Sequence, residues 1–192
     1  MAFAMKPVSS PRLHPKELLM WLYLAATAML FAGFTSAYLV QRFHDFWKGF
    51  EIPPIFWANT GVLLLSSYAY ARAQRGLAFG NYRHLQLGLM TALSLGVIFL
   101  LGQVIGWQML IRQGLFLAGN HKAVSYFYVF TGLHALHLGV GVVGLAYWTF
   151  RALRYRISIK DSLGLKLMGL FWHGLDVLWI YLIVFLQLNQ LL

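Results

Sequence analysis

Three histidines and one carboxylate lie inside long apolar runs in the last third of the chain. His134 and His137 are three residues apart, and His173 and Asp176 repeat that spacing. Side chains three residues apart share one face of a helix, so two neighbouring antiparallel helices could bring all four groups together. Imidazole and carboxylate groups placed in this way could bind a metal ion, relay protons, or hydrogen-bond to one another.

The number and spacing of these groups favour one of the three chemistries. Three histidines and one acid are fewer than a membrane di-iron centre needs, and their spacing does not match a bis-histidine haem site. A chain without cysteine also has no thiolate ligand. We therefore expect no catalytic residue, metal or cofactor in this chain. The favoured hypothesis is an interhelical polar network of His134, His137, His173 and Asp176 that fixes the register of two helices.

Three other interpretations stay open at this point. A lone acid in a membrane helix is a candidate for a proton relay, which would make Asp176 functional rather than structural. The chain could also be a membrane enzyme with a His/Asp metal centre. A small transporter would need a polar pathway and preferably broken helices.

The elements that must position these groups are membrane-spanning helices. Of the 192 residues, 60% are hydrophobic and 10% are charged, whereas soluble domains carry about 25% charged residues. An apolar run of about 20 residues can cross a bilayer as a helix, and the period-two alternation of a β-barrel is not seen. The sequence predicts an all-α, polytopic membrane helix bundle, a single domain over 1–192, with five transmembrane helices at about 17–41, 54–74, 83–112, 123–151 and 163–190.

The formal net charge of +10 would suit a nucleic-acid partner, but the basic residues stand at the ends of the apolar runs and form no continuous polar face. We therefore expect no nucleic-acid binding. Four basic residues flank one side of the predicted bundle: Arg42, Lys48, Arg112 and Lys122. Eleven flank the other: Lys6, Arg12, Lys16, Arg72, Arg75, Arg83, Arg151, Arg154, Arg156, Lys160 and Lys166. The positive-inside rule then predicts a cytoplasmic N-terminus and a C-terminus outside.

The last two apolar runs resemble one protein family. The run SYFYVFTGLHALH over residues 125–137 resembles the Phe-rich segment leading into Thr-Gly-Phe/Leu-His-Gly-Leu-His in subunit III of haem–copper terminal oxidases. The run WHGLDVLWIYL over residues 172–182 is similar to the Trp-His-Phe-Val-Asp-Val-Val-Trp-Leu-Phe-Leu of the same subunit. The likeness extends from about residue 18 to the end of the chain, and the two late motifs carry most of it.

The resemblance implies a non-catalytic accessory subunit of a proton-pumping cytochrome c or quinol oxidase in aerobic respiration. It implies that the chain binds catalytic subunit I and subunit II, with further respiratory subunits as additional partners, and that haem and copper belong to the partner subunits. It also implies phospholipid binding, with Arg151 at the position of a family residue that contacts anionic headgroups. The corresponding location is the bacterial cytoplasmic (inner) membrane, which the chain would cross several times.

Two features differ from the mitochondrial-type members of that family. Those members have seven helices, whereas the five predicted here resemble the shorter bacterial form. The family also carries a buried glutamate on its equivalent of the first predicted helix, where this chain has Thr27 and Ala28. The chemistry of that glutamate therefore cannot be transferred to this protein.

Overall fold

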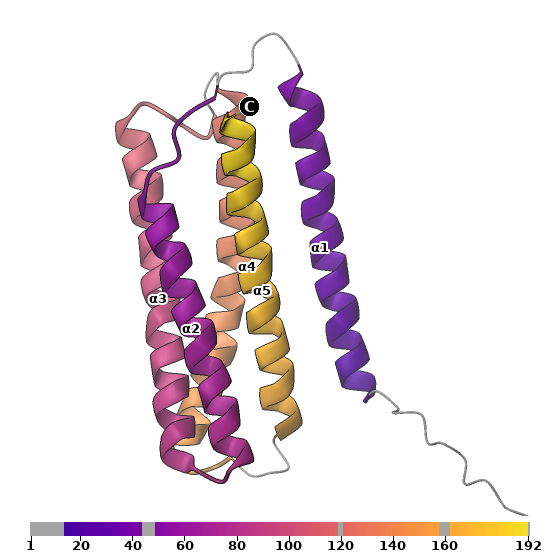
Figure 1. Ribbon diagram of the computed structural model, residues 1–192, viewed down its shortest axis with the longest axis vertical. Coiled ribbons are helices and arrows are strands. Elements are labelled where there is room, and N and C mark those ends of the chain that lie inside the picture. Colours follow the sequence, from indigo (N-terminus) through magenta and orange to yellow (C-terminus); the bar gives the residue numbers. More distant parts are fainter. Residues whose placement is uncertain (1–13, 44–48, 119–120, 158–161, 192) are drawn as a thin grey trace, which may run out of the picture.

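The computed structural model describes residues 14–43, 49–118, 121–157 and 162–191. This part of the chain forms five helices and no strand: α1 (Pro15–Arg42), α2 (Ile55–Ala78), α3 (Tyr82–Arg112), α4 (Lys122–Leu153) and α5 (Ser162–Leu191). Successive helices run in opposite directions (Figure 1). The predicted all-α class and the number of helices are confirmed. Four of the basic residues on which the orientation prediction depends lie outside the described residues: Lys6, Arg12, Lys48 and Lys160.

Four of the helices, α1, α3, α4 and α5, are long and apolar enough to cross a membrane. α2 has 24 residues, which at about 1.5 Å per residue also exceeds the thickness of a hydrocarbon core. It is less apolar than the others because it carries polar side chains such as Asn59 and Ser66, both of which are buried against the other helices. That α2 is a fifth span stays a prediction, supported by its position alongside α3 (Figure 1).

A tight turn joins α2 to α3. Gly80 takes a φ of 68°, a left-handed conformation that glycine adopts without strain. The Asn81 N–H then donates to the carbonyl of Gly76 (2.8 Å), while the Asn81 side chain accepts from the His84 N–H (3.2 Å) and so caps the start of α3. The turn places α2 and α3 side by side, and Gly88 lets their backbones approach closely.

α1 stands apart from the other helices in Figure 1 and packs on α4 and α5. Its buried residues are Thr27, Phe31, Thr35 and Tyr38, whose spacing forms one stripe along the helix. Three polar contacts connect α1 to α5 at different levels: Glu17 with Lys166 (2.8 Å), Thr35 with Tyr181 (3.1 Å) and Arg42 with Asn189 (2.8 Å).

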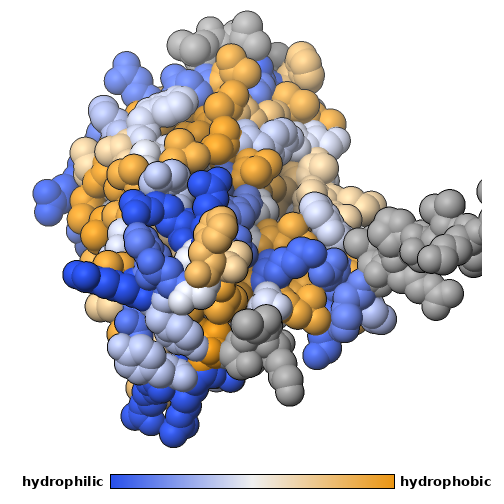
Figure 2. All heavy atoms as spheres, turned by 60° about the horizontal axis from the view of Figure 1, so that its bottom comes forward, coloured by the Kyte–Doolittle hydropathy of each residue, from blue (hydrophilic) through white to orange (hydrophobic). Residues whose placement is uncertain are grey.

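Most of the described basic residues gather at the end of the bundle where α1 begins, the lower end in Figure 1. This end also holds the end of α2, the start of α3, the end of α4 and the start of α5. Figure 2, in which it comes forward, shows hydrophilic side chains gathered among apolar ones. We call it the basic end. Its assignment to the cytoplasm stays a prediction.

Candidate functional site

His173 and Asp176 lie together on α5, as their spacing predicts. His173 Nδ1 lies 3.9 Å from Asp176 Oδ2, and the same nitrogen shares a hydrogen bond with Ser67 Oγ of α2. The ring of Tyr70, also on α2, meets the His173 ring edge-on at 5.9 Å. Asp176 is 4% exposed, and neither of its oxygens has a hydrogen-bond partner within the described residues. Within the described residues, His173 is the basic side chain that lies within 4 Å of this carboxyl.

The two histidines of α4 lie in different surroundings. His137 Nδ1 donates to the carbonyl of Leu133 in its own helix (2.7 Å), and its ring lies 6.2 Å from that of Phe31 on α1. His134 is fully buried, with its ring 6.0 Å from Phe99 of α3 and 4.9 Å from Trp179 of α5. Neither of its nitrogens has a partner in the described part of the chain.

The four residues of the predicted network thus occupy three separate environments. The structure pairs His173 with Asp176, but it does not join this pair to His134 or His137 by a hydrogen bond. The polar partner of His173 is Ser67, and it comes from α2 rather than α4. Any role of these side chains in helix register therefore has to be argued separately for each environment.

Polar residues of α2 hold two tryptophans of α5. Trp172 Nε1 donates to Ser66 Oγ (3.2 Å), and Trp179 Nε1 donates to Thr60 Oγ1 (3.0 Å). Both indoles are fully buried. These hydroxyl partners cannot be identified from the sequence, since serine and threonine are common in membrane helices and their spacing alone does not show which helix they face.

Trp172 touches three helices at once. Besides its bond to α2, it lies so close to Gly96 of α3 that an added Cβ there would be 2.8 Å from the indole, and at Gly141 of α4 the corresponding distance is 3.1 Å. Two small residues therefore form the slot that the indole fills. Trp172 is the side chain that packs α5 against the rest of the bundle at this level.

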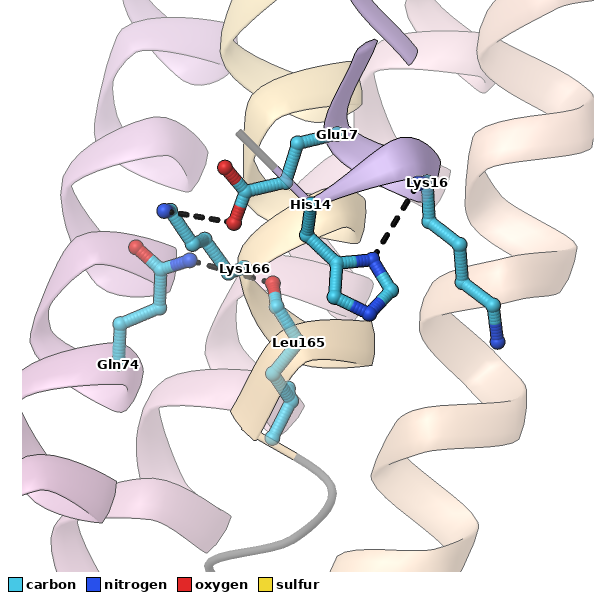
Figure 3. A network of polar contacts seen from close by, with 6 residues as sticks. All are labelled: His14, Lys16, Glu17, Gln74, Leu165 and Lys166. Carbon is cyan, nitrogen blue, oxygen red and sulfur yellow. Dashed lines mark hydrogen bonds and ion pairs between the residues drawn. The ribbon is translucent and has the colours of Figure 1, made fainter. Parts of the chain in front are cut away.

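A groove runs along α5 from the basic end to the level of His173. It consists of three adjoining cavities of about 620, 360 and 350 Å³; the first two share Glu17, Gln74 and Lys166, and the last two share Trp21, Leu170 and His173. Figure 3 shows its mouth, where Lys166 pairs with Glu17 and the Gln74 amide donates to the carbonyl of Leu165 (3.2 Å). Thr27 and Ala28 line its inner end.

A second groove, of about 630 Å³, lies between α1, α4 and α5, and Lys16, Gly144 and Trp148 are among its lining residues. The Arg151 guanidinium lies 5.3 Å above the Trp148 ring, and its Nη2 donates to the carbonyl of Arg156 (3.0 Å). Lys16 and Arg151 both lie at the basic end. The surroundings of Arg151 thus combine positive charge, an interfacial indole and an apolar groove.

Metal-ligating side chains do not gather in the described ranges: no group of three or more His, Cys, Asp or Glu residues lies close enough together there to hold a metal ion. The pair formed by His173 and Asp176 would supply two ligands, and His134 is enclosed by aromatic rings. What this arrangement offers is hydrogen bonding and packing between helices.

Comparison with known proteins gives a consistent match. The model of the family "Cytochrome c oxidase subunit III" matches residues 17–189. The chain is 32% identical to cytochrome c oxidase subunit 3 of Antidorcas marsupialis over 134 residues, which cover 70% of this chain and 49% of the relative. The same protein of Aepyceros melampus is 31% identical over the same coverage. The chain thus spans about half the length of these curated relatives. Because the family model covers almost the whole helical part, the chain belongs to the cytochrome c oxidase subunit III family.

Proposed function

We propose that this chain is the non-catalytic accessory subunit III of a proton-pumping haem–copper terminal oxidase. It would bind catalytic subunit I and subunit II in a bacterial cytoplasmic membrane, with haem and copper held by those partners. The observation that carries this proposal is the family match over residues 17–189, which includes both motif helices, α4 and α5. On α5, His173, Trp172 and Trp179 each have a hydroxyl partner on α2.

In this proposal the chain acts as a scaffold. His173 and Ser67, Trp172 and Ser66, and Trp179 and Thr60 each connect α5 to α2. Inside a membrane, where apolar burial between helices contributes little, such contacts and close packing set the register. A bundle whose helices keep a fixed register presents a constant surface to subunit I. It thereby stabilises the proton-uptake side of subunit I during turnover.

Phospholipid binding is the second part of the proposal. An anionic headgroup would lie at Lys16 and Arg151, and an acyl chain would follow the groove between α1, α4 and α5. Cationic pockets between membrane helices suit anionic headgroups, and tryptophans such as Trp148 prefer the headgroup level. The lipid would then fill space between α1 and its neighbours that protein side chains leave open.

Purification from native membranes in a mild detergent tests the proposal as a whole. We expect the chain to elute with larger subunits that contain haem and copper, detected by their optical spectrum and by metal analysis of the complex. Elution of the chain alone at every detergent concentration, or with a complex that lacks haem, would contradict it.

Replacing Asp176 with asparagine tests the register role. The change keeps the shape of the side chain but replaces the carboxyl group near His173 with an amide, and a single polar contact in a membrane contributes about 0.6 kcal/mol. We therefore expect about threefold faster loss of this chain from the purified complex, and earlier decay of activity during turnover. Unchanged retention and unchanged decay would refute a register role for Asp176.

A further inference from the structure

A third groove lies on the outer side of the α2–α3 hairpin at the basic end. It has a volume of about 450 Å³. Ala69 and Gly88 form its floor, and larger side chains such as Tyr68 and Leu87 form its walls. None of its lining residues belongs to α1, α4 or α5, so it is separate from the grooves described above.

The groove follows from the way in which α2 and α3 pack. A Cβ at Gly88 would lie 2.8 Å from the carbonyl oxygen of Ala69 and 2.9 Å from the Cα of Ala73, so the two backbones are almost in contact there. Small side chains leave a channel above this line of contact. Tyr68 is 60% exposed and Leu87 is 54% exposed, so the side chains that form the walls of the channel project from the surface of the bundle.

The mouth of the groove is positively charged. Arg72 ends its α2 wall and His84 begins its α3 wall, and no acidic side chain lines it. Within the described residues, Arg72 forms no hydrogen bond or ion pair, and the imidazole of His84 forms none either. A guanidinium in this position offers its forked donors to a partner from outside the chain, and a phosphate fits them in bidentate geometry.

The length of the groove suits an amphipathic ligand. Leu65 lies seven residues from Arg72 on α2, and Leu95 lies eleven from His84 on α3. At 1.5 Å per residue the walls extend roughly 10 to 16 Å from the charged mouth. The groove therefore runs from the level of lipid headgroups into the hydrocarbon region, with charge only at its outer end.

We propose that this groove binds one phospholipid with an anionic headgroup. Arg72 would contact the phosphate with His84 beside it, and one acyl chain would lie on Ala69 and Gly88. A phospholipid is favoured over a helix of another protein because the groove combines one cationic end with an apolar remainder, which is the charge pattern of a lipid. The inference requires only that the chain lies in a membrane and does not depend on the oxidase partners.

The test uses the purified complex that contains this chain, reconstituted in phosphatidylcholine nanodiscs. Photoactivatable phosphatidylglycerol or phosphatidylcholine, with the reactive group on an acyl chain, is added as a minor component, and the labelled peptides are identified. We expect phosphatidylglycerol to label the α2 and α3 walls several-fold more than phosphatidylcholine does. Raising the salt concentration should reduce the difference, because the attraction is electrostatic.

Two matched charge variants locate the headgroup. Arg72→Gln should lower labelling by phosphatidylglycerol about fivefold, since one basic residue at an anionic membrane surface contributes about 1 kcal/mol. Arg75→Gln removes the same charge from the same end of α2, but Arg75 does not line the groove, so labelling should stay within about twofold of the unmodified complex. If Arg72→Gln prevents assembly, the salt dependence and the following variant still decide.

A third variant fills the groove. Thr91 is exposed on the α3 wall, and its hydroxyl bonds only to its own helix. Thr91→Phe should therefore lower labelling of the walls by phosphatidylglycerol to the level seen with phosphatidylcholine, while leaving Arg72 and His84 in place. Equal labelling by both lipids, equal loss in the Arg72 and Arg75 variants, or labelling unaffected by Thr91→Phe would overturn the proposal. So would a photocrosslinker at Tyr68 that reacts with another protein subunit.

Isolation of the chain without oxidase subunits would contradict the proposed function, but the labelling would still decide on this groove.

Discussion

Replacing Trp172 with alanine is expected to destabilise the bundle by about 3 kcal/mol, the lower end of the range for removing a buried tryptophan. The lower end of that range applies because moving an apolar side chain from lipid into the bundle gains little free energy. The indole fills the slot between Gly96 and Gly141 and binds Ser66, so its removal leaves a cavity shared by four helices. The measurement is the temperature at which the purified complex loses this chain. We expect a fall of several degrees, or failure to assemble.

Three controls separate packing from other effects. Trp57 is 44% exposed, so Trp57→Ala removes the same side chain without opening an interior cavity and should change the temperature little. Ser66→Ala removes the hydroxyl that accepts from Trp172 and donates to the carbonyl of Ala92, and at about 0.6 kcal/mol for each contact it should cost about 1 kcal/mol. Trp172→Phe should fall between wild type and Trp172→Ala. If Trp57→Ala proved as harmful as Trp172→Ala, the slot would not be the cause.

Gly88→Ala is the second substitution for which we expect a large effect. Its new Cβ would meet the backbone of Ala69 and Ala73 at 2.8 to 2.9 Å, and a helix backbone cannot turn aside as a side chain can. α2 and α3 would have to separate, at a cost of about 2 kcal/mol. The same temperature scan should show a clear decrease. Because Gly88 also forms the floor of the outer groove, this variant is unsuited to the lipid test.

The matched control is Gly132→Ala in the middle of α4. A Cβ at Gly132 would have nothing within 4 Å, and alanine favours a helix over glycine by about 1 kcal/mol. The variant should therefore be neutral or slightly more stable. Equal losses in the two glycine variants would indicate a general sensitivity to substitution rather than a close approach of α2 and α3.

The helices could be predicted from the sequence because each apolar run is long and is bounded by charged or turn-forming residues. The end of α2 shows where this reasoning stops. The predicted end at residue 74 follows the loss of apolar residues at Arg72 and Gln74, but the helix continues to Ala78. Hydrogen bonding in the turn at Gly80 and Asn81 ends the helix, and these backbone bonds do not depend on hydropathy.

The candidate site could be predicted in part. A spacing of three residues placed His173 and Asp176 on one face of α5, and the structure has them 3.9 Å apart. The spacing could not reveal Ser67 as the partner of His173, because the order in which helices neighbour one another depends on packing across the whole bundle. For the same reason the aromatic surroundings of His134 could not be read from the residues beside it.

The position of α1 has a consequence for how the protein is made. The residues that Glu17, Thr35 and Arg42 contact on α5 are 149, 146 and 147 positions further along the chain. Because α1 precedes α5 in the chain, it cannot complete these contacts until α5 has been synthesised. Closing so long a loop is slow compared with forming the α2–α3 hairpin. During biogenesis we therefore expect α1 to lie in the lipid without its α5 contacts, accessible to chaperones and membrane proteases, until α5 has been inserted.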